Sequence, residues 1–319
     1  MEKKFWITET FTAELIKFAK IKKKVIVLDA DLADDLNLYS FKKKFPKRFL
    51  QNGIAEQDMV SMAGGLALLG FIPIVNSFAS FLSSRSNEQI YNNATELTKI
   101  IYINLYAGLI PAGAGKSHQS IRDLALISSI PNFKIYNPLN YIDTSMILKH
   151  CIFNEKKNAC IRLNIGPPPL KIKNLDNIKF KDGEGVEICK GGKIIVFASG
   201  QYVLNEVLIA NEIFKQKGIK LSIINISTLN YFKVKWFKKI LKKINYIFCI
   251  EDNFQDGGLG NLLLSFLVKN KLLANKKYFN LALNDFPECG TTEEVLNYHN
   301  LSSKKIYEYI NNKINEKNN

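Results

Sequence analysis

The stretch Gly53-Ile54-Ala55-Glu56-Gln57-Asp58-Met59 organises the first half of the chain. An apolar run from Met59 to Leu69 follows it and predicts a helix, so Glu56 stands at a helix N-terminus. The helix macrodipole stabilises a negative charge at that position, which is a sufficient structural reason for an acid. A short apolar strand comes next and leads to two spaced aromatic residues, Phe78 and Phe81. Whether Glu56 also has a chemical role depends on the segments around it.

Apolar strands and helical segments alternate along both halves of the chain. In the first half, strands are expected at residues 24–31, 72–76, 99–106, 134–136 and 159–163. In the second half, strands are expected at residues 193–199, 219–224 and 246–251. Such alternation is typical of parallel sheets covered by helices. The predicted fold class is therefore α/β, with two doubly wound sheets.

A proline-rich segment separates the two halves. Gly166-Pro-Pro-Pro-Leu170 is followed by a polar stretch from Lys171 to Lys190, and consecutive prolines favour an extended backbone. We therefore expect a first domain at residues 1–168, a linker at residues 169–190 and a second domain at residues 191–319. A chain of 319 residues is long enough for about two domains.

The net charge of +15 raises the possibility of a nucleic-acid partner. The lysines are spread along the chain among Asn, Ile and Glu, and no zinc-finger spacing or RNA-binding aromatic signature accompanies them. We therefore expect no nucleic-acid partner. A basic surface can still meet an acidic subunit or an anionic substrate.

Membrane and secretion signals are missing from the sequence. No apolar run reaches the roughly 18 residues of a membrane span, and the N-terminus lacks the apolar stretch of a signal peptide. The five cysteines lie far apart in the sequence, without the spacing of a disulfide framework or a zinc site. We expect a cytoplasmic protein with no membrane partner.

Residues 45–89 closely resemble the pyrimidine-binding domain of the transketolase family of thiamine diphosphate enzymes. The resemblance implies that Glu56, within the G-I-A-E-Q motif, hydrogen-bonds the cofactor's aminopyrimidine ring at the nitrogen para to the amino group. A carboxyl group kept protonated there helps the cofactor's own amino group to remove the thiazolium proton. The resemblance also implies that Phe78 and Phe81 pack on this ring, although core packing explains a Phe pair about as well. Arg85 and Gln89 are expected to order the helix or a subunit contact.

The segment Gly113-Ala-Gly-Lys-Ser-His-Gln-Ser120 resembles the family's G-x-D-G-P-T-H-Q loop. The resemblance implies that His118 hydrogen-bonds the donor substrate and exchanges protons with it, which imidazole can do near neutral pH. A surface-loop histidine is the alternative. The loop departs from the family at Ala114, which replaces a substrate-binding Asp, and at Lys116, which replaces Pro.

Four features that bind sugar phosphates in the family are missing here. The substitutions are Tyr106 for His, Ile165 for Arg and Asp35 for Ser, and the amino-terminal Arg is absent. Phosphate recognition depends on such donors, so at least one substrate is expected not to be an ordinary pentose or hexose phosphate. Lys116 and Arg162 can compensate only if they point toward the substrate. The substrate-binding candidates are His118, Lys116, Arg162 and Asp35.

The second half carries Glu251-Asp-Asn-Phe-Gln-Asp-Gly-Gly-Leu-Gly-Asn261, which resembles the signature of the family's carboxy-terminal domain. In the family this domain has no catalytic residue and supports subunit assembly. A tight strand-to-helix turn explains its glycines better than a nucleotide site does. Full-length members also begin with a Gly-Asp-Gly…Asn motif that holds Mg²⁺ and the cofactor's diphosphate. This chain lacks that motif, so no metal ligand is expected among its residues.

The resemblance covers nearly the whole chain and implies the carboxy-terminal subunit of a split transketolase. Such a subunit would act in carbohydrate metabolism, transferring a two-carbon ketol or an acyl unit from a keto donor to a carbonyl acceptor. It would be active only with an amino-terminal partner that holds the diphosphate and Mg²⁺, in a heterotetramer that self-associates through the pyrimidine and C-terminal domains.

Three alternatives remain at this stage. A beta subunit of a 2-oxoacid dehydrogenase is disfavoured by Ser117-His-Gln and by Ile130-Pro-Asn, which match transketolase better. A relative of deoxyxylulose phosphate synthase stays open. A non-catalytic scaffold that keeps only the fold is disfavoured by the retention of Glu56 and His118.

Overall fold

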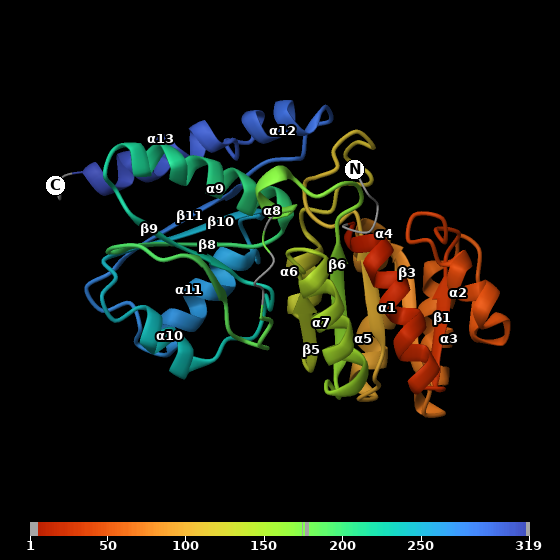
Figure 1. The fold of residues 1–319 in the computed structure, drawn as a ribbon. Helices are drawn as coiled ribbons and strands as arrows, with labels where there is room; N and C mark the ends of the chain where they lie inside the picture. Colours follow the sequence, from red (N-terminus) through yellow and green to blue (C-terminus); the bar gives the residue numbers. More distant parts are fainter. Residues whose placement is uncertain (1–5, 174, 176–178, 317–319) are drawn as a thin grey trace.

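Two helix-covered sheets lie side by side in the computed structural model, which describes residues 6–173, 175 and 179–316 (Figure 1). The first sheet is parallel, with six strands in the order β2-β1-β3-β4-β6-β5. The second has five strands in the order β11-β10-β8-β9-β7, of which β7 is antiparallel. The predicted α/β class with two doubly wound sheets is confirmed.

The strands of the first sheet are β1 (Val25–Asp29), β2 (Phe49–Gln51), β3 (Ile72–Phe78), β4 (Ile101–Leu105), β5 (Phe133–Tyr136) and β6 (Asn158–Leu163). Those of the second are β7 (Val186–Cys189), β8 (Ile194–Ala198), β9 (Leu221–Asn225), β10 (Tyr246–Phe254) and β11 (Lys277–Leu283). Every residue of β1 and β4 is buried, because helices cover both faces of the sheet.

The helices of the first domain form two layers. One layer is α1 (Ile7–Ile21) and α7 (Tyr141–Phe153), and the other is α3 (Glu56–Leu68), α4 (Ala79–Arg85), α5 (Asn87–Thr95) and α6 (Asp123–Ser128). The short α2 (Tyr39–Lys44) and η2 (Pro46–Arg48) lie between β1 and β2 in the chain. Apolar residues of both layers face the sheet between them.

In the second domain, α9 (Gln201–Gln216) and α13 (Ser303–Asn315) cover one face of the sheet, and α10 (Val234–Ile240) and α11 (Leu259–Lys269) cover the other (Figure 1). The short α8 (Leu170–Lys173) and α12 (Thr292–Tyr298) complete the fold. Hydrophobic clusters join residues of both domains, so the two sheets share a packed interface.

Several elements differ from the sequence-based expectation. The segment expected to be a linker contains a strand, because Val186–Cys189 forms β7 and pairs with β9. Residues 174 and 176–178 of the expected linker lie outside the described residues. The helical stretch after β3 is divided at Ser86, which has a non-helical backbone, into α4 and α5. The sequence analysis missed two edge strands, β2 and β11.

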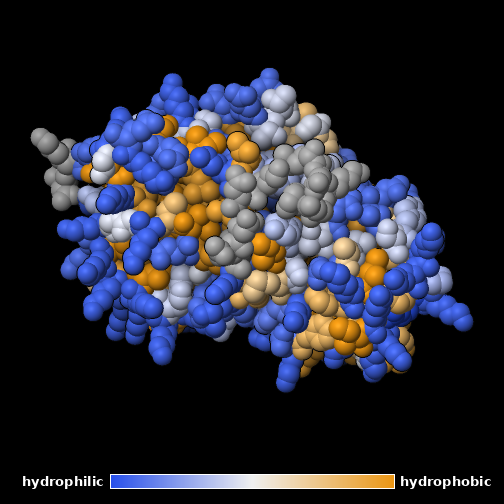
Figure 2. Space-filling view, viewed as in Figure 1, coloured by the Kyte–Doolittle hydropathy of each residue, from blue (hydrophilic) through white to orange (hydrophobic). Residues whose placement is uncertain are grey.

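Hydrophilic residues cover much of both domains on the face shown in Figure 2, with apolar areas between them. No described helix combines the length and the hydrophobicity needed to span a bilayer.

Glu251 of β10 holds the start of α11. Its two carboxylate oxygens accept hydrogen bonds from the backbone N–H groups of Leu259 (2.6 Å) and Gly260 (2.7 Å). A Cβ at Gly260 would lie 2.2 Å from Asn280, and one at Gly258 would lie 2.5 Å from the Glu251 carboxylate. The glycines therefore serve the close packing of a strand-to-helix turn.

Arg162 of β6 links the two domains from a buried position. Its guanidinium donates to both carboxylate oxygens of Asp123, at 2.8 and 3.0 Å, and to Asn253 Oδ1 of the second domain at 2.7 Å. Arg162 and Asp123 are each only 1% exposed. This position differs from the expected substrate-binding one, because the guanidinium points into the domain interface and is held there by its partners.

Asp123→Asn should destabilise the protein strongly, because it leaves the buried Arg162 guanidinium without its carboxylate partner. We expect a loss of about 3–5 kcal/mol in the free energy of unfolding, measured by urea denaturation. Glu212→Gln is the matched control, since it removes the exposed pair between Glu212 and Lys215. That change should cost less than about 1 kcal/mol. Equal effects of the two substitutions would contradict the role given to Arg162.

Glu251→Gln should change how stability depends on pH. Burial raises the pKa of Glu251 to about 7 in spite of its hydrogen bonds from Gly260 and Leu259, whereas the unfolded chain loses this proton near its ordinary pKa of about 4.3. The contribution of Glu251 to stability is therefore full below the unfolded pKa and falls as pH rises toward the folded one.

The variant lacks this titration. Its free energy of unfolding should therefore rise relative to wild type, by an amount on the order of a few kcal/mol, between about pH 4 and about pH 8. Urea titrations of both proteins at several pH values measure this difference. A difference that does not change with pH would show that Glu251 is not protonated in the folded protein.

Candidate functional site

Glu56 is the first residue of α3, and its side chain lies beneath the surface, only 4% exposed. Ala55 precedes the helix without a side-chain cap, so the carboxylate itself stands at the helix N-terminus. Arg85 Nη1 donates to Glu56 Oε1 at 3.0 Å, and Ser77 Oγ lies 3.5 Å from the same oxygen. The end of β3 and the end of α4 therefore hold the carboxylate from two sides.

The expected aromatic residues lie next to the expected histidine. The rings of Phe78 and Phe81 have centroids 5.5 Å apart. The imidazole of His118 lies 5.5 Å from Phe78 and 5.3 Å from Phe81. Ser117 Oγ and His118 Nδ1 are 2.9 Å apart. Two segments that are separated in the sequence thus form one cluster at the carboxyl end of the first sheet, where ligands bind in open α/β folds.

Tyr106 adds a fourth ring to this cluster, 4.8 Å from Phe78. It follows β4 with a positive φ of 55°, a conformation that is uncommon for a bulky residue. Burial raises the pKa of Tyr106, and the nearby Asp35 carboxylate raises it further. Burial also raises the pKa of Tyr202 to about 12, with a contribution from Tyr106. Asp35 and Tyr202 thus lie near Tyr106.

Tyr202, at the start of α9, belongs to the second domain and was missed by the sequence analysis. No local pattern marks it, because only the packing of the two domains brings it near Tyr106. The pKa of Asp35 is itself raised by burial, with contributions from Asp34 and Asp29. This end of the site is acidic.

Lys116, an expected substrate-binding residue, is paired with the second domain. Its ammonium group lies 3.0 Å from Glu288 Oε1, and this hydrogen bond raises the pKa of Lys116. Both side chains are exposed. Lys116 also lines a cavity of about 670 Å³, to which Phe81 and Arg85 contribute from the first domain. Lys116 is therefore paired with Glu288 at the edge of this cavity and is not a free cation.

Arg85 has a larger part in the site than the sequence analysis assigned to it. Besides its ion pair with Glu56, its guanidinium carbon lies 3.7 Å from the centroid of the Phe81 ring. Its backbone carbonyl accepts a hydrogen bond from Gln57. Arg85 therefore occupies the space between the Phe81 ring and the Glu56 carboxylate.

A shallow pocket of about 450 Å³ opens at Glu56, and Ile54, Gln57, Asp58 and Arg85 contribute to its walls. A buried carboxylate, with the Phe81 ring on the far side of its partner Arg85, fits a flat, nitrogen-containing ring that makes one hydrogen bond and stacks. The site thus fits the aminopyrimidine half of thiamine diphosphate. It does not fit a diphosphate, since Arg85 is the one cation among the described residues that line this pocket, and Glu56 already engages it.

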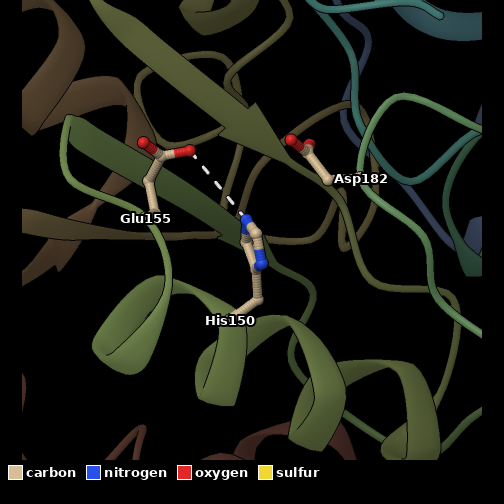
Figure 3. Close-up of side chains that lie close together, drawn as sticks. All are labelled: His150, Glu155 and Asp182. Atoms are coloured by element: carbon tan, nitrogen blue, oxygen red, sulfur yellow. Dashed lines mark ion pairs between the residues drawn. The ribbon is translucent and has the colours of Figure 1, made fainter.

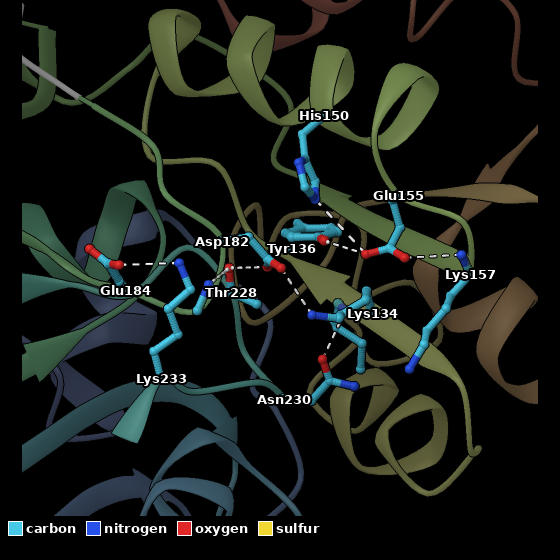
Figure 4. Close-up of polar contacts among 12 residues, drawn as sticks. Lys134, Tyr136, His150, Glu155, Lys157, Asp182, Glu184, Thr228, Asn230 and Lys233 are labelled. Carbon is cyan, nitrogen blue, oxygen red and sulfur yellow. Dashed lines mark hydrogen bonds and ion pairs between the residues drawn. The ribbon is translucent and has the colours of Figure 1, made fainter. Parts of the chain in front are cut away.

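A separate polar cluster joins α7 to the segment before β7. Figure 3 shows His150, Glu155 and Asp182, which each offer one possible metal-ligand atom, with these atoms within 4.8 Å of one another. Asp182 is already occupied, however, because Lys134 lies 3.0 Å from Oδ2 and Thr228 donates to Oδ1 at 3.2 Å (Figure 4). The ammonium group of Lys134 supplies the positive charge that a metal ion would bring. We therefore assign this cluster to holding the connecting segment against both domains.

The fold and the site together define a two-domain α/β protein with a pyrimidine-binding first domain. A family model for the transketolase pyrimidine-binding domain matches residues 3–165, and one for the transketolase C-terminal domain matches residues 183–306. The chain belongs to the transketolase family. Members of this transketolase and deoxyxylulose phosphate synthase family are thiamine diphosphate-dependent transferases.

Some relatives are about as long as this chain, and others are about twice as long. A "putative transketolase C-terminal section" from Methanocaldococcus jannaschii is 32% identical over 93% of this chain and 92% of its own length. The 1-deoxy-D-xylulose-5-phosphate synthase of Clostridium kluyveri is 29% identical over 95% of this chain but only 48% of its own. This chain therefore spans about half the length of that relative.

Solved structures agree with the fold. A structure described as "split gene transketolase, inactive beta4 tetramer" is 26% identical, with a TM-score of 0.84 over 96% of this chain and 97% of that one. The transketolase of Campylobacter jejuni has the same fold, with a TM-score of 0.73 at 17% identity over 94% of this chain and 46% of its own.

Proposed function

We propose that this chain is the C-terminal subunit of a heteromeric, thiamine diphosphate-dependent enzyme of the transketolase type. It transfers a two-carbon ketol or an acyl unit from a keto donor to a carbonyl acceptor. The observation that carries the proposal is the cluster of Phe78, Phe81 and His118, to which Arg85 connects the buried Glu56 through its ion pair with Glu56 and its contact with the Phe81 ring. Its chemistry fits an aminopyrimidine ring beside a residue that can exchange protons.

The proposed roles follow from the positions of the side chains. Glu56 hydrogen-bonds the aminopyrimidine ring, and Phe78 and Phe81 pack against it. When bound, the cofactor supplies a nucleophilic carbon that attacks the carbonyl group of the donor. His118 exchanges a proton with the donor's oxygen atoms through Nε2, since Ser117 engages Nδ1.

Arg85 has to leave Glu56 when the aminopyrimidine ring arrives, because both compete for the same carboxyl group. Arg85 is 48% exposed, so its guanidinium can turn into solvent, and the cofactor's ring then replaces it as the partner of the buried Glu56 carboxyl group. Free chain and assembled enzyme would then differ in the partner of Glu56.

The partner proposal rests on what the pocket around Glu56 offers. It has the Glu56 carboxylate for one half of the cofactor, and the Phe81 ring lies next to it across Arg85, but its described lining residues include no free cation for the diphosphate. We assign the diphosphate and Mg²⁺ to a companion chain that carries the Gly-Asp-Gly…Asn motif. The beta4 assembly of a similar split transketolase, described as inactive, supports this division of labour.

A second candidate is transfer of an acyl unit from a 2-oxoacid donor. Several relatives that match nearly the whole of this chain are 1-deoxy-D-xylulose-5-phosphate synthases, which favours this chemistry. The two candidates differ in the donor. A 2-oxoacid donor would release carbon dioxide in the reconstituted enzyme, whereas a keto sugar would not.

Glu56→Gln should slow deprotonation of the cofactor by orders of magnitude in the reconstituted pair, because an amide cannot replace the acid. Each loss of about 1.4 kcal/mol in stabilisation of the barrier lowers the rate tenfold. Exchange of the thiazolium proton, followed by NMR, measures this step directly. Glu212→Gln, a change at an exposed glutamate of α9, serves as the control and should exchange at the wild-type rate.

Calorimetry on the separate chains completes this test. This chain alone should show no tight, Mg²⁺-dependent binding of thiamine diphosphate, and the mixture with the companion chain should show it. Tight binding by this chain alone would refute the split arrangement. An unchanged exchange rate in Glu56→Gln would mean that another residue supplies the acid.

The substrate prediction depends on the charged residues around the site. Asp35 repels a phosphate group, and the two cations that might compensate are engaged, Lys116 by Glu288 and Arg162 by Asp123. Loss of one charge-assisted hydrogen bond costs about 1.5–3 kcal/mol, so selection for a phosphate tail should be lost. An unphosphorylated or nucleotide-linked sugar would fit.

A competition assay on the reconstituted pair tests this prediction. It offers ribose 5-phosphate and xylulose 5-phosphate against neutral keto sugars and nucleotide-activated keto sugars. We expect turnover of the second group in preference to the first. Preference for the two pentose phosphates would show that the companion chain supplies the phosphate-binding groups or that the phosphate site has been misplaced.

A further inference from the structure

Residues of both domains line the cavity of about 670 Å³ beside the loop that carries His118. Its walls come from α4, from the segment 116–122, from the end of β10 and from residues 284–287, which follow β11. We infer that this cavity holds the nucleotide part of a nucleotide-linked sugar, that is, a phosphate group joined to a flat ring. The inference rests on the proposed function and deepens it, because it names the class of one substrate.

The size and the walls of the cavity suit such a ligand. Pockets for small molecules have volumes of about 300–1,000 Å³ and mostly apolar walls with a few polar groups. The apolar part of the wall includes Phe81, Ile121, Phe254 and Phe286. Phe286 is 76% exposed, so its ring is open to a partner. An open aromatic ring can stack on a flat ring such as a nucleobase.

Arg122 is the cation that the cavity offers to an anion. It is exposed, and its Nη2 donates to Ser84 Oγ at 3.1 Å. Within residues 6–173, 175 and 179–316, no carboxylate forms an ion pair with it. A guanidinium group presents a fork of N–H donors that matches phosphate oxygens. Arg122 therefore has the donors that recognition of a phosphate group needs.

The other charges at the cavity leave this role to Arg122. Lys116 and Arg85 also line the cavity, but each is paired with a glutamate. Asp285 is the one acid among the lining residues that the structure describes, and its Oδ1 accepts a hydrogen bond from the backbone N–H of Phe286. Cations therefore outnumber acids at this cavity, which favours an anionic ligand.

Buried polar atoms of the lining residues give an independent indication. Ser80 Oγ, Gln119 Oε1 and Ser120 Oγ are buried, and none has a hydrogen-bond partner in the described part of the chain. Gln119 Nε2 already donates to two backbone carbonyl groups, so Oε1 is an acceptor that needs a donor. Buried polar atoms are nearly always hydrogen-bonded. The hydroxyl groups of a sugar both donate and accept, so they can satisfy such atoms.

The cavity differs from the phosphate site that the family resemblance implies. That site was expected at Tyr106, Ile165 and Asp35, and none of these residues lines the cavity. A phosphate group beside Arg122 would thus avoid the Asp35 carboxylate. Ser117, the neighbour of His118, does line the cavity. A sugar attached to a nucleotide in the cavity would therefore extend toward His118.

Calorimetric titration of the full chain with the four ribonucleoside 5′-monophosphates tests the inference, with the nucleosides and inorganic phosphate as the separate halves. At least one monophosphate should bind about tenfold or more tightly than either half. Arg122→Gln should weaken that binding about tenfold or more, because a charge-assisted hydrogen bond is lost. Phe286→Ala should weaken it about fivefold or more, because a stacked ring is lost.

Two matched controls remove the same kinds of group elsewhere. Lys269→Gln removes an exposed positive charge at the end of α11, and Tyr91→Ala removes a ring of α5 that is 50% exposed. Neither residue lines the cavity, so both variants should bind the nucleotide as the wild type does. Circular dichroism checks that each variant is folded.

The outcomes separate this inference from the proposed function. Weakened binding in both cavity variants, with wild-type binding in both controls, is the expected result. The inference is wrong if no monophosphate binds more tightly than inorganic phosphate, or if Arg122→Gln binds as the wild type does. An equal loss in Lys269→Gln would show general attraction to a basic surface and would also overturn it. The titration needs neither cofactor nor companion chain, so failure of the reconstituted pair to transfer a carbon unit would refute the proposed function alone.

Discussion

The placement of the two domains depends on Arg162, whose buried ion pair with Asp123 lies within the first domain and whose hydrogen bond to Asn253 reaches the second. Removing both charges from water is costly, and the cost is offset only because the pair is bidentate and Asn253 accepts a further hydrogen bond. Asp123 begins α6, five residues after His118 in the chain. The same interaction that docks the second domain therefore fixes one end of the loop that carries the expected proton-exchanging residue.

No catalytic residue was expected in the second domain, yet its residues contact the loop that carries His118. Gln119 Nε2 donates to the carbonyl oxygens of Leu109 and Glu288, which ties the histidine loop to the second domain. The pair between Lys116 and Glu288 adds a second tie, although it is exposed and contributes little energy. Tyr202 completes the surroundings of Tyr106. The domain that supports assembly thus also shapes the edge of the candidate active site.

The chain is strongly basic, but the basic residues in or near the candidate site are paired with carboxylates. The net charge is +15, yet three basic residues in or near the site are engaged: Arg85 by Glu56, Lys116 by Glu288 and Arg162 by Asp123. Asp35 adds negative charge beside Tyr106. Net charge describes the surface of the whole molecule, whereas recognition of an anion needs particular donors that are free at the site.

The sequence by itself determined the α/β class and the family, and it named Glu56, Phe78, Phe81 and His118 as candidate site residues, because these inferences depend on local periodicity and on short motifs. It did not determine the role of Arg85, the position of Tyr202 or the partners of Arg162. Arg162 and Asp123 are 39 residues apart in the chain, and Lys116 and Glu288 are 172 apart. The pair of Arg162 and Asp123 depends on the tertiary fold of the first domain, and the pair of Lys116 and Glu288 depends on how the two domains pack together. Packing brings distant residues together that no local pattern connects, so only the tertiary structure decided which cations remain free to bind a substrate.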